Sequence, residues 1–170
     1  MGELANFPLF VPKPPLAVTA TNWNQLNSLN TKVSEITIPS NSLNDASLNV
    51  LDLSRFRRLK RLVIGDECFM YMKEVKLTGL WSLESVEIGM NSFTQHKNDA
   101  GNDPNRHFYL KNCPHLKSLK MGRYSFFDYT VIEIENVDAL EVIEMGELNE
   151  ESYNFYYASL ELKSIRIHSE

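Results

Sequence analysis

Short runs of alternating apolar and polar residues recur along the chain and share one pattern. Each copy begins with a leucine or valine, and three residues later comes a triplet in which the first and third residues are apolar. In four of the six copies a glycine directly follows this triplet. The copies begin at Val33, Leu59, Leu83, Leu116, Leu140 and Leu162, at spacings of 26, 24, 33, 24 and 22 residues. The spacing of 33 corresponds to a unit of 24 residues that carries an insertion of nine. Repetition at this period is typical of architectures built from stacked units. We number the units that begin at the first five of these residues as units 1 to 5.

Each unit contains two further repeated features. A small residue precedes phenylalanine in Cys68-Phe69, Ser92-Phe93 and Ser125-Phe126, with Ser42-Leu43 at the same place in unit 1. A second alternating segment follows, and an apolar residue three positions later closes the unit. The alternating pairs are Leu51/Leu53, Val75/Leu77, Phe108/Leu110 and Ile132/Ile134, and the closing residues are Phe56, Leu80, Cys113 and Val137. Alternation with a period of two predicts strands that have one buried face.

These features predict a mainly β fold, a solenoid of about five to six coils of roughly 24 residues with two short parallel strands per coil. Each coil would bury its apolar edge only against the next coil, so that one core runs along the stack. A glycine follows the first strand in four units, at Gly65, Gly89, Gly122 and Gly146, and we expect a turn with positive φ there. The phenylalanines are expected to fill the coil interior.

The repeat unit resembles that of a known family. The segment Asn112–Phe126, NCPHLKSLKMGRYSF, resembles a leucine-rich repeat, most closely of the BspA-like variety, and the resemblance covers roughly residues 33–167. Met121 and Met145 depart from the usual isoleucine, and unit 5 lacks the small residue and phenylalanine after Gly146. The resemblance implies a leucine-rich-repeat-type solenoid whose role is protein–protein contact, adhesion or scaffolding.

The two ends of the chain differ from the repeats. Residues 1–32 form a Pro-rich N-terminal segment and a predicted helical cap, and residues 33–170 form the repeat domain with an insertion loop at 95–106. The early prolines predict an extended segment over residues 1–20. After it, Trp23, Leu26 and Leu29 share one helical face and follow a capping residue, which predicts a short N-terminal helix over the first coil. An irregular segment docked by Trp23 is the alternative.

At the other end, the pattern predicts that Leu162 opens the first strand of a new coil, which the sequence does not cover with a polar cap. Three interpretations stay open. The chain is a fragment of a longer array, a partner covers this end, or Ser169 and Glu170 shield a blunt terminus. An uncovered end of a stacked array exposes core residues and a strand edge.

Composition narrows the possible functions and settings. The formal net charge of −5 argues against nucleic-acid binding, which usually requires a basic face. No apolar run approaches the ~20 residues of a membrane span, and the N-terminus is a poor secretory signal. Cys68 and Cys113 both occupy positions that are apolar or small in other units, so we expect core residues rather than a disulfide or a nucleophile. These observations favour a reducing, cytoplasmic setting.

Stacking the units predicts a ladder of alternating charges along the first sheet. One column is Lys60, Glu84, Lys117, Glu141 and Lys163, and a second is Val63, Glu87, Lys120, Glu144 and Arg166. A ladder of this kind fixes the register of the strands, and cross-strand ion pairs stabilise a sheet modestly. Alternatively, the same surface is a concave face that binds a partner. The second sheet is expected to expose Asp52, Lys76, Tyr109 and Glu133 beside Ser54, Thr78, Lys111 and Glu135, a mixed surface that alternates less strictly.

The candidate partner-binding residues come from the first sheet and the insertion loop. On the sheet they are Arg61, Ser85, Ser118, Val142 and Arg166, and in the loop they are Lys97, Asp99, Asp103 and Arg106. Polar loops that project from a rigid array are common contact sites, although a tolerated excursion explains the loop equally well. The two aspartates do not have calcium-loop spacing, so no metal site is expected.

The sequence contains no recognisable catalytic set. The histidines lack repeat equivalents and metal-ligand spacing, and no phosphate-binding glycine loop or nucleophile elbow is present. An acidic run at Glu147, Glu150 and Glu151 beside Tyr153, Phe155, Tyr156 and Tyr157 is either a contact patch or an irregular fifth coil, in which Phe155 and Tyr157 point inward.

The favoured hypothesis is therefore a non-catalytic protein-binding module that requires no cofactor and binds neither nucleic acid nor membrane. The first alternative is a structural subunit, or a fragment of a longer array, that docks or self-associates end to end through its uncapped C-terminal coil. The second is a carbohydrate-active β-helix enzyme. That class needs clustered carboxylates, whereas the acids here alternate with bases.

Overall fold

The protein is mainly β, with two parallel sheets and one short helix in the part of the chain that the structure describes, which comprises residues 16–95, 104–147 and 151–164 of a computed structural model. The first sheet contains β1 (Ala17–Thr19), β2 (Glu35–Ile38), β4 (Arg61–Ile64), β6 (Ser85–Ile88), β8 (Ser118–Met121) and β10 (Val142–Met145), in that order. The second contains β3 (Val50–Asp52), β5 (Glu74–Thr78), β7 (His107–Lys111), β9 (Val131–Glu135) and β11 (Ser159–Lys163). The helix is α1 (Trp23–Ser28).

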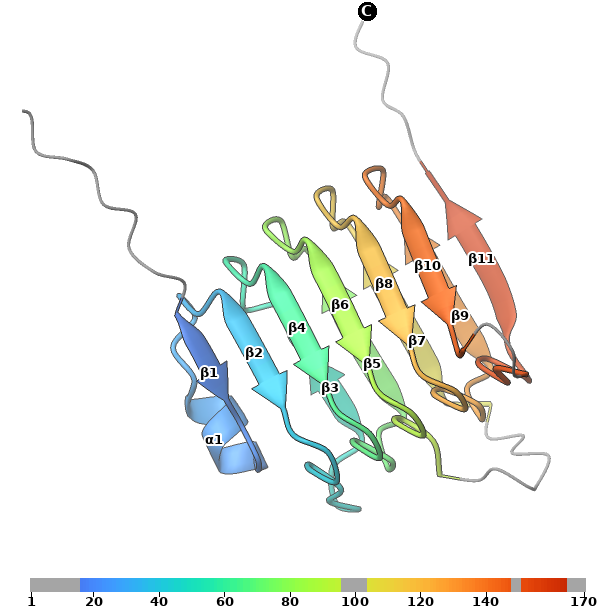
Figure 1. Cartoon of the computed structure of the whole chain (residues 1–170), viewed down its shortest axis with the longest axis horizontal. Coiled ribbons are helices and arrows are strands. Elements are labelled where there is room, and N and C mark those ends of the chain that lie inside the picture. Colours follow the sequence, from blue (N-terminus) through green and yellow to red (C-terminus); the bar gives the residue numbers. More distant parts are fainter. Residues whose placement is uncertain (1–15, 96–103, 148–150, 165–170) are drawn as a thin grey trace, which may run out of the picture.

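From β2 onward, successive strands alternate between the two sheets, and each strand pairs in parallel with its equivalent in the neighbouring unit (Figure 1). The registers keep equivalent residues opposite one another: Leu62 pairs with Val86, Val86 with Leu119, and Leu119 with Ile143. The prediction of a mainly β chain with two short parallel strands per unit is confirmed. The alignment of units deduced from the sequence is also correct for units 1 to 5.

Leu162 does not open a first-sheet strand, as the pattern predicted, and the rest of that predicted strand, from residue 165, lies outside the described residues. Residues Leu162 and Lys163 belong to β11 in the second sheet, where Leu162 pairs with Ile134 and Lys163 with Glu135. Lys163 therefore does not continue the first-sheet column that contains Glu141. The physical reason is that two alternating apolar patterns follow each other closely here, Leu160/Leu162 and Ile165/Ile167. Leu160 and Leu162 repeat the second-sheet pair of unit 4, and this pattern positions the strand.

The core lies between the sheets. Along β5, the outward positions are half-buried while Val75 and Leu77 are buried, and β9 repeats this with Ile132 and Ile134. The first sheet contributes its own buried alternate positions, such as Leu62 on β4. Strand alternation thus sorts each unit into a shared apolar interior and two polar outer faces.

The beginning of the described chain lies at one edge of the structure, where β1 and α1 are found (Figure 1). The predicted helix forms. Asn22 is its N-cap, and its Oδ1 accepts a hydrogen bond of 3.0 Å from the Gln25 N–H. Leu26 is buried, and the Trp23 ring meets the Phe69 ring edge-on at 6.1 Å. The sequence predicted extended chain before the helix but not that β1 would pair with β2.

The turns after the first-sheet strands require glycine for a reason other than the one expected. Of the four glycines, only Gly146 has a positive φ, at 66°. At Gly65 a Cβ atom would lie 2.5 Å from the Ser40 backbone nitrogen, and at Gly122 it would lie 2.5 Å from that of Met90. The expectation of positive φ is therefore wrong at Gly65, Gly89 and Gly122, where glycine instead permits close contact with the preceding unit.

The small residue in each turn forms a repeated hydrogen bond. The Ser92 hydroxyl donates to the Gly65 carbonyl at 2.7 Å, and the Ser125 hydroxyl donates to the Gly89 carbonyl at 2.5 Å. The Cys68 thiol occupies the same position and donates to the Pro39 carbonyl. Small size was expected at this position from the sequence. The structure shows that these side chains also bind each unit to the backbone of the one before it.

Unit 5 keeps this turn at a shifted place in the sequence. Asn154 Nδ2 donates to the Gly122 carbonyl at 2.8 Å, which is the role of the small residue in the other units. The next residue, Phe155, stacks on Phe126 with ring centroids 5.2 Å apart and packs against the core. The expectation that Phe155 points inward is confirmed. Relative to unit 4, five additional residues separate Gly146 from this phenylalanine.

The phenylalanine stack offers a direct test of the contact between units. Phe93 is fully buried between Phe69 and Phe126, at centroid distances of 5.1 and 4.6 Å with nearly parallel rings. We predict that Phe93→Ala lowers the free energy of unfolding by about 3–5 kcal/mol, because it removes a buried side chain and leaves a cavity. Denaturant unfolding measures this change. Phe93→Leu should cost clearly less, and equal losses for both variants would contradict the role of the stack.

Candidate interaction surfaces

Four of the predicted contact residues form one row on the outward face of the first sheet. Arg61 pairs in register with Ser85, Ser85 with Ser118, and Ser118 with Val142, so their side chains lie on adjacent strands β4, β6, β8 and β10. Arg61 and Val142 are exposed and the two serines are half-buried. The fifth predicted member, Arg166, lies outside the described residues. The structure therefore brings together four candidates from four repeat units.

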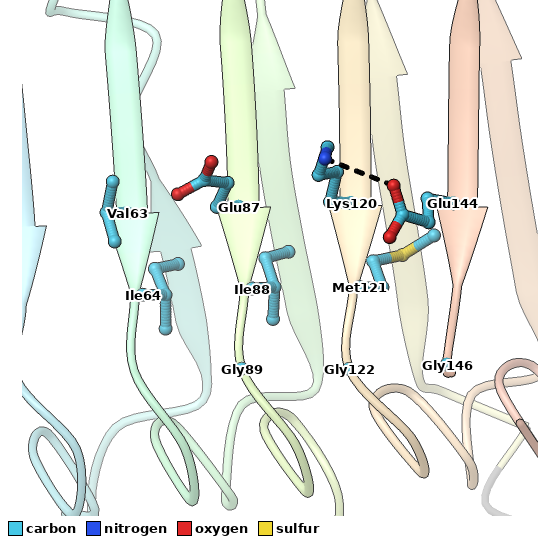
Figure 2. Close-up of a pocket in the computed structure, with 10 residues that line it drawn as sticks. All are labelled: Val63, Ile64, Glu87, Ile88, Gly89, Lys120, Met121, Gly122, Glu144 and Gly146. Carbon is cyan, nitrogen blue, oxygen red and sulfur yellow. Dashed lines mark ion pairs between the residues drawn. The ribbon is translucent and has the colours of Figure 1, made fainter. Parts of the chain in front are cut away.

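A second row, two residues further along the same strands, contains the charge ladder. Figure 2 shows Val63, Glu87, Lys120 and Glu144 on consecutive strands. Lys120 Nζ lies 3.1 Å from a carboxylate oxygen of Glu144. Glu87 instead pairs diagonally with the guanidinium of Arg61, at 3.0 Å. The ion pairs thus connect the two rows as well as adjacent strands.

The ends of these strands border a shallow hollow of about 290 Å³. It is lined on the strands by the charged side chains of Glu87, Lys120 and Glu144. Beyond the strand ends it is lined by the backbone of Gly89 and Gly122 (Figure 2). Before the strands, Lys60 and Glu84 form a further ion pair at 3.4 Å. All of these pairs are substantially solvent-exposed, so each stabilises the fold by only about 0–1 kcal/mol. Their charges remain accessible to a partner.

The outward face of the second sheet is also charged, but its ion pairs are arranged differently. Lys76 pairs with Glu74 on its own strand, whereas Lys111 pairs across strands with Glu133 and, at 3.6 Å, with Glu135. The hydrogen bond to Glu133 is the main cause that raises the pKa of Lys111, so this amine stays charged. A hollow of about 450 Å³ lies on this face, beside Asp52, Lys76 and Tyr109.

Arg106, the last residue of the insertion loop, was predicted to be a surface contact residue but is buried. Lys97, Asp99 and Asp103 lie outside the described residues, but Arg106 is described and is only 1% exposed. Arg106 is therefore not a surface contact residue. The register explains why: Asn105 aligns with the buried Met72 and Tyr129, yet it is exposed. The insertion leaves a polar residue where other units have a buried side chain, and Arg106 occupies the interior beside it.

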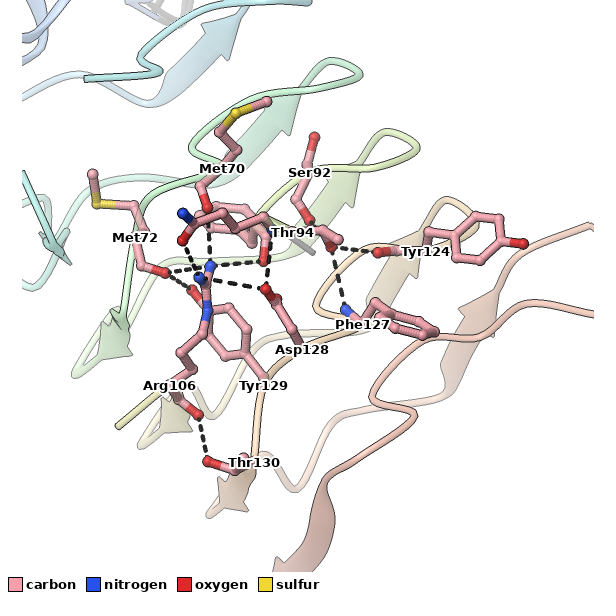
Figure 3. Close-up of polar contacts among 12 residues, drawn as sticks. Met70, Met72, Ser92, Thr94, Arg106, Tyr124, Phe127, Asp128, Tyr129 and Thr130 are labelled. Carbon is pink, nitrogen blue, oxygen red and sulfur yellow. Dashed lines mark hydrogen bonds and ion pairs between the residues drawn. The ribbon is translucent and has the colours of Figure 1, made fainter. Parts of the chain in front are cut away.

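The Arg106 guanidinium is held by acceptors from three units (Figure 3). One nitrogen, Nη2, donates to the backbone carbonyls of Met70 and Met72 at 2.9 and 3.0 Å. The other, Nη1, lies 3.4 Å from Asp128 Oδ2 in an ion pair whose side chains are both buried. The Tyr129 ring lies beneath the guanidinium, at 5.1 Å from its centroid. A charge this deeply buried is tolerated because both terminal nitrogens, Nη1 and Nη2, have acceptors.

The same cluster fixes the base of the insertion. Arg106 Nη1 donates to Gln95 Oε1 at 3.2 Å, and the Gln95 backbone N–H donates to Asp128 Oδ2 at 3.1 Å. The first bond thus joins Gln95, the last described residue before residues 96–103, to Arg106, which lies shortly after them. This cluster was not predictable from the repeat pattern, because Arg106 and Asp128 are each a single polar residue in an irregular segment. The aligned Asn105 is the only signal of it that the repeat offered.

Aromatic side chains gather where units 4 and 5 meet. Phe127 is buried and stacks with Tyr156 at 5.3 Å, and Tyr157 meets it edge-on at 5.4 Å. Tyr124 and Tyr153 stack at 5.1 Å, beside the guanidinium of Arg123. Tyr157 therefore packs on Phe127 and is only half-buried, rather than joining Phe155 in the interior. Of the adjacent glutamates, Glu150 lies outside the described residues.

Both cysteines are buried and free, as expected for core residues. Among the residues placed by the structure, no three histidine, cysteine or acidic side chains are grouped in a way that could hold a metal ion. In that same portion of the chain, no helix is both long enough and apolar enough to cross a membrane.

The buried ion pair predicts a characteristic response to mutation. Asp128→Ala leaves the Arg106 charge buried without its carboxylate, and we expect a loss of about 3–5 kcal/mol of unfolding free energy. Removing both charges with Arg106→Met and Asp128→Ala should cost less than the sum of the single changes. A double-mutant cycle from denaturant unfolding provides the comparison. Additive losses would show that the pair is not coupled.

A second prediction concerns pH. Burial raises the pKa of Cys113 from 9.0 to about 11, so the folded state favours the protonated thiol. The contribution of this thiol to the free energy of unfolding is therefore complete below the unfolded pKa near 9, and it is lost as the pH rises towards 11. Each unit of difference between the folded and unfolded pKa corresponds to about 1.4 kcal/mol. Cys113→Val, which copies Val137 in unit 4, should gain stability relative to the native chain over this range. A difference that does not change between pH 8 and 11 would contradict the burial effect.

The comparisons with known proteins add no family to these observations. No family model, no curated protein and no solved structure matches the chain.

Proposed function

We propose that the chain is a leucine-rich-repeat-type solenoid that acts as a non-catalytic protein-binding module. It presents the outward face of its first sheet, together with the polar insertion, to a macromolecular partner. The observation that carries this proposal is the single row formed by Arg61, Ser85, Ser118 and Val142, one residue from each of four successive units. Strand pairing fixes the spacing of these side chains, so a partner meets a surface that is already ordered.

The charge pattern favours a protein over a nucleic acid. Positive groups on this face alternate with carboxylates, as in the pairs Lys120–Glu144 and Arg61–Glu87. A phosphate backbone needs a continuous basic surface, which these carboxylates would repel. A protein surface can instead present opposite charges at matching positions, and such complementarity mainly provides specificity and orientation.

The same alternation supports a non-catalytic role. The glutamates above the first-sheet hollow pair with Lys120 or Arg61 rather than with one another. A glycosidase-like mechanism requires two carboxyl groups that face each other across a substrate, one of them kept protonated. We therefore propose binding, without chemical turnover, at this surface.

The insertion extends the proposed surface because its base is held rigidly. Gln95 and Arg106 are joined by a side-chain hydrogen bond, and Asp128 binds both residues. These bonds fix where the insertion leaves and rejoins the repeat, which supports its inclusion in the proposed surface.

Charge reversal tests which face binds. The immobilised chain captures proteins from its native source, and each captured protein is then tested against three variants: Arg61→Glu, Lys97→Glu and Lys76→Glu. We expect a specific partner to be retained by the native chain and by Lys76→Glu, which alters only the second-sheet face, but lost with Arg61→Glu or Lys97→Glu. The melting temperatures should stay close to that of the native chain, because exposed pairs contribute little.

The opposite pattern would remove the proposed surface. If partners are lost only with Lys76→Glu, the second sheet is the binding face. If none of the three reversals alters capture, neither sheet face nor the insertion contributes to recognition through these charges.

A further inference from the structure

A dense basic segment lies in the turn between β3 and β4. Five of the chain's 17 lysine and arginine residues occupy positions 55–61, although the formal net charge of the chain is −5. The nearest acidic residues on either side are Asp52 and Asp66. The turns that lead from the second sheet to the first lie in one line along the upper edge of the molecule (Figure 1). We call this line the turn edge, and it comprises residues 53–60, 79–84, 112–117 and 136–141.

Three of the five basic side chains have partners within the chain. Arg55 donates to two backbone carbonyls at the C-terminal end of α1, at 2.7 and 3.0 Å. Lys60 and Arg61 each pair with a glutamate of the neighbouring unit. Arg57 and Arg58 are exposed, and among the residues that the structure describes neither side chain has a hydrogen-bond or ion-pair partner. Two guanidinium groups are therefore available to an external ligand.

An exposed tryptophan lies on the adjacent turn. Trp81 occupies the position that corresponds to Arg57, because both residues directly follow the apolar residue that closes their unit. Backbone hydrogen bonds join the two turns at both ends, at 3.1 Å where they begin and at 2.8 Å where they end. Trp81 is 56% exposed. Neighbouring turns thus carry two exposed guanidinium groups and one exposed indole.

The fold does not explain these residue types. The corresponding position is Pro114 in the third turn and Asp138 in the fourth, so the repeat requires neither a basic nor an aromatic side chain there. Arginine and tryptophan are enriched at protein interfaces, where they often contribute much of the binding free energy. Arg57 and Trp81 are therefore better explained by a contact with a partner than by packing within the chain.

The distribution of charge along the turn edge limits the kind of partner. Glu84 lies in the second turn, and Asp138 and Glu141 lie in the fourth. These carboxylates interrupt the continuous basic surface that a phosphate backbone requires. A membrane surface requires several apolar anchors beside the basic residues, whereas Trp81 is the one large apolar side chain exposed on the four turns.

A short acidic peptide segment matches the same residues. A guanidinium group can donate two parallel hydrogen bonds to one carboxylate, which gives arginine an advantage over lysine in such contacts. An indole ring offers a broad apolar surface to a neighbouring aliphatic or aromatic side chain. Two or three carboxylates beside one apolar residue therefore complement the two arginines and the tryptophan.

We propose that Arg57, Arg58 and Trp81 bind a short acidic segment of a partner protein. Carboxylates of the segment pair with the two guanidinium groups, and an apolar side chain of the segment covers the indole. The site lies on the turn edge and does not include the first-sheet row from Arg61 to Val142. It therefore does not depend on the function proposed for that row.

Titration with labelled synthetic peptides tests the site. The probes carry aspartates or glutamates on both sides of one leucine, and their counterparts carry asparagine or glutamine instead of the acids. We expect the full chain to bind only the acidic peptides. The double variant Arg57→Gln with Arg58→Gln should weaken this binding by about tenfold or more, and Trp81→Ala should also weaken it. Binding should shift the tryptophan emission to shorter wavelength, and this shift should be absent from Trp81→Phe, which keeps Trp23.

The matched control is Lys73→Gln with Lys163→Gln, which removes the same two charges elsewhere. Lys73 precedes β5 at the end of that strand away from the turn edge, and Lys163 lies on β11. At physiological salt the control should bind within about twofold of the native chain, because distant exposed charges are screened. The melting temperatures of all variants should stay close to that of the native chain, since the altered side chains are exposed.

Three results would overturn the proposal. The first is that the acidic peptides do not bind the native chain. The second is an equal loss of binding in the arginine variant and the lysine control, which would indicate unspecific attraction. The third is binding of a single-stranded oligonucleotide or of phosphatidylserine vesicles that requires Arg57 and Arg58 and that the acidic peptides do not displace.

Discussion

Each repeat unit in this chain depends on its neighbours to cover its apolar side chains. A unit supplies one first-sheet strand and one second-sheet strand, and its inward residues are buried where an equivalent strand or the helix α1 covers them on each side. Leu119 has Val86 and Ile143 as its neighbours and is fully buried, whereas Ile143, with a neighbour on one side, is largely exposed. Most of the gain from burying apolar surface therefore arises between units rather than within them. The helix α1 solves the same problem at the other end by burying Leu26 against the first units.

The turns determine how closely the units approach. Where a first-sheet strand ends, the backbone of one unit passes so near the next that a Cβ at Gly122 would lie within 2.5 Å of a backbone nitrogen. The side chain of Ser125 then donates to the carbonyl of Gly89, and Phe126 stacks on Phe93 directly after it. A glycine, a small hydrogen-bond donor and a phenylalanine thus have three separate physical roles in one turn. Asn154 shows that what matters at the middle position is the donor group, since its amide replaces the serine hydroxyl in unit 5.

The alternation of apolar and polar residues was enough to predict the strands, their parallel alignment and the row from Arg61 to Val142, because a period of two fixes the face of every side chain. The alternation did not predict the sheet to which Leu162 belongs, because its pattern fits a strand of either sheet. The pairing of Leu162 with Ile134 places it in the second sheet. The alternation gave the right residue but the wrong reason at Gly65, because close contact between units cannot be seen in one unit. It also missed the Arg106–Asp128 pair, since an insertion breaks the register that makes the other columns readable. The repeated positions were predictable, and the exceptions to the repeat were not.

The outer faces and the C-terminal end therefore differ in what a partner can gain from them. On the first-sheet face, Lys120 already has Glu144 and Arg61 already has Glu87, so a partner must replace existing ion pairs that are weak and exposed. Such a surface favours selectivity, because only a matching arrangement of charges compensates for the pairs that are lost. By contrast, Leu160 and Leu162 on β11, the last second-sheet strand of the described chain, are 54% and 62% exposed, and covering their apolar area would yield free energy. The first-sheet face thus offers exposed charges in a fixed arrangement, whereas the end strands β10 and β11 offer exposed apolar area.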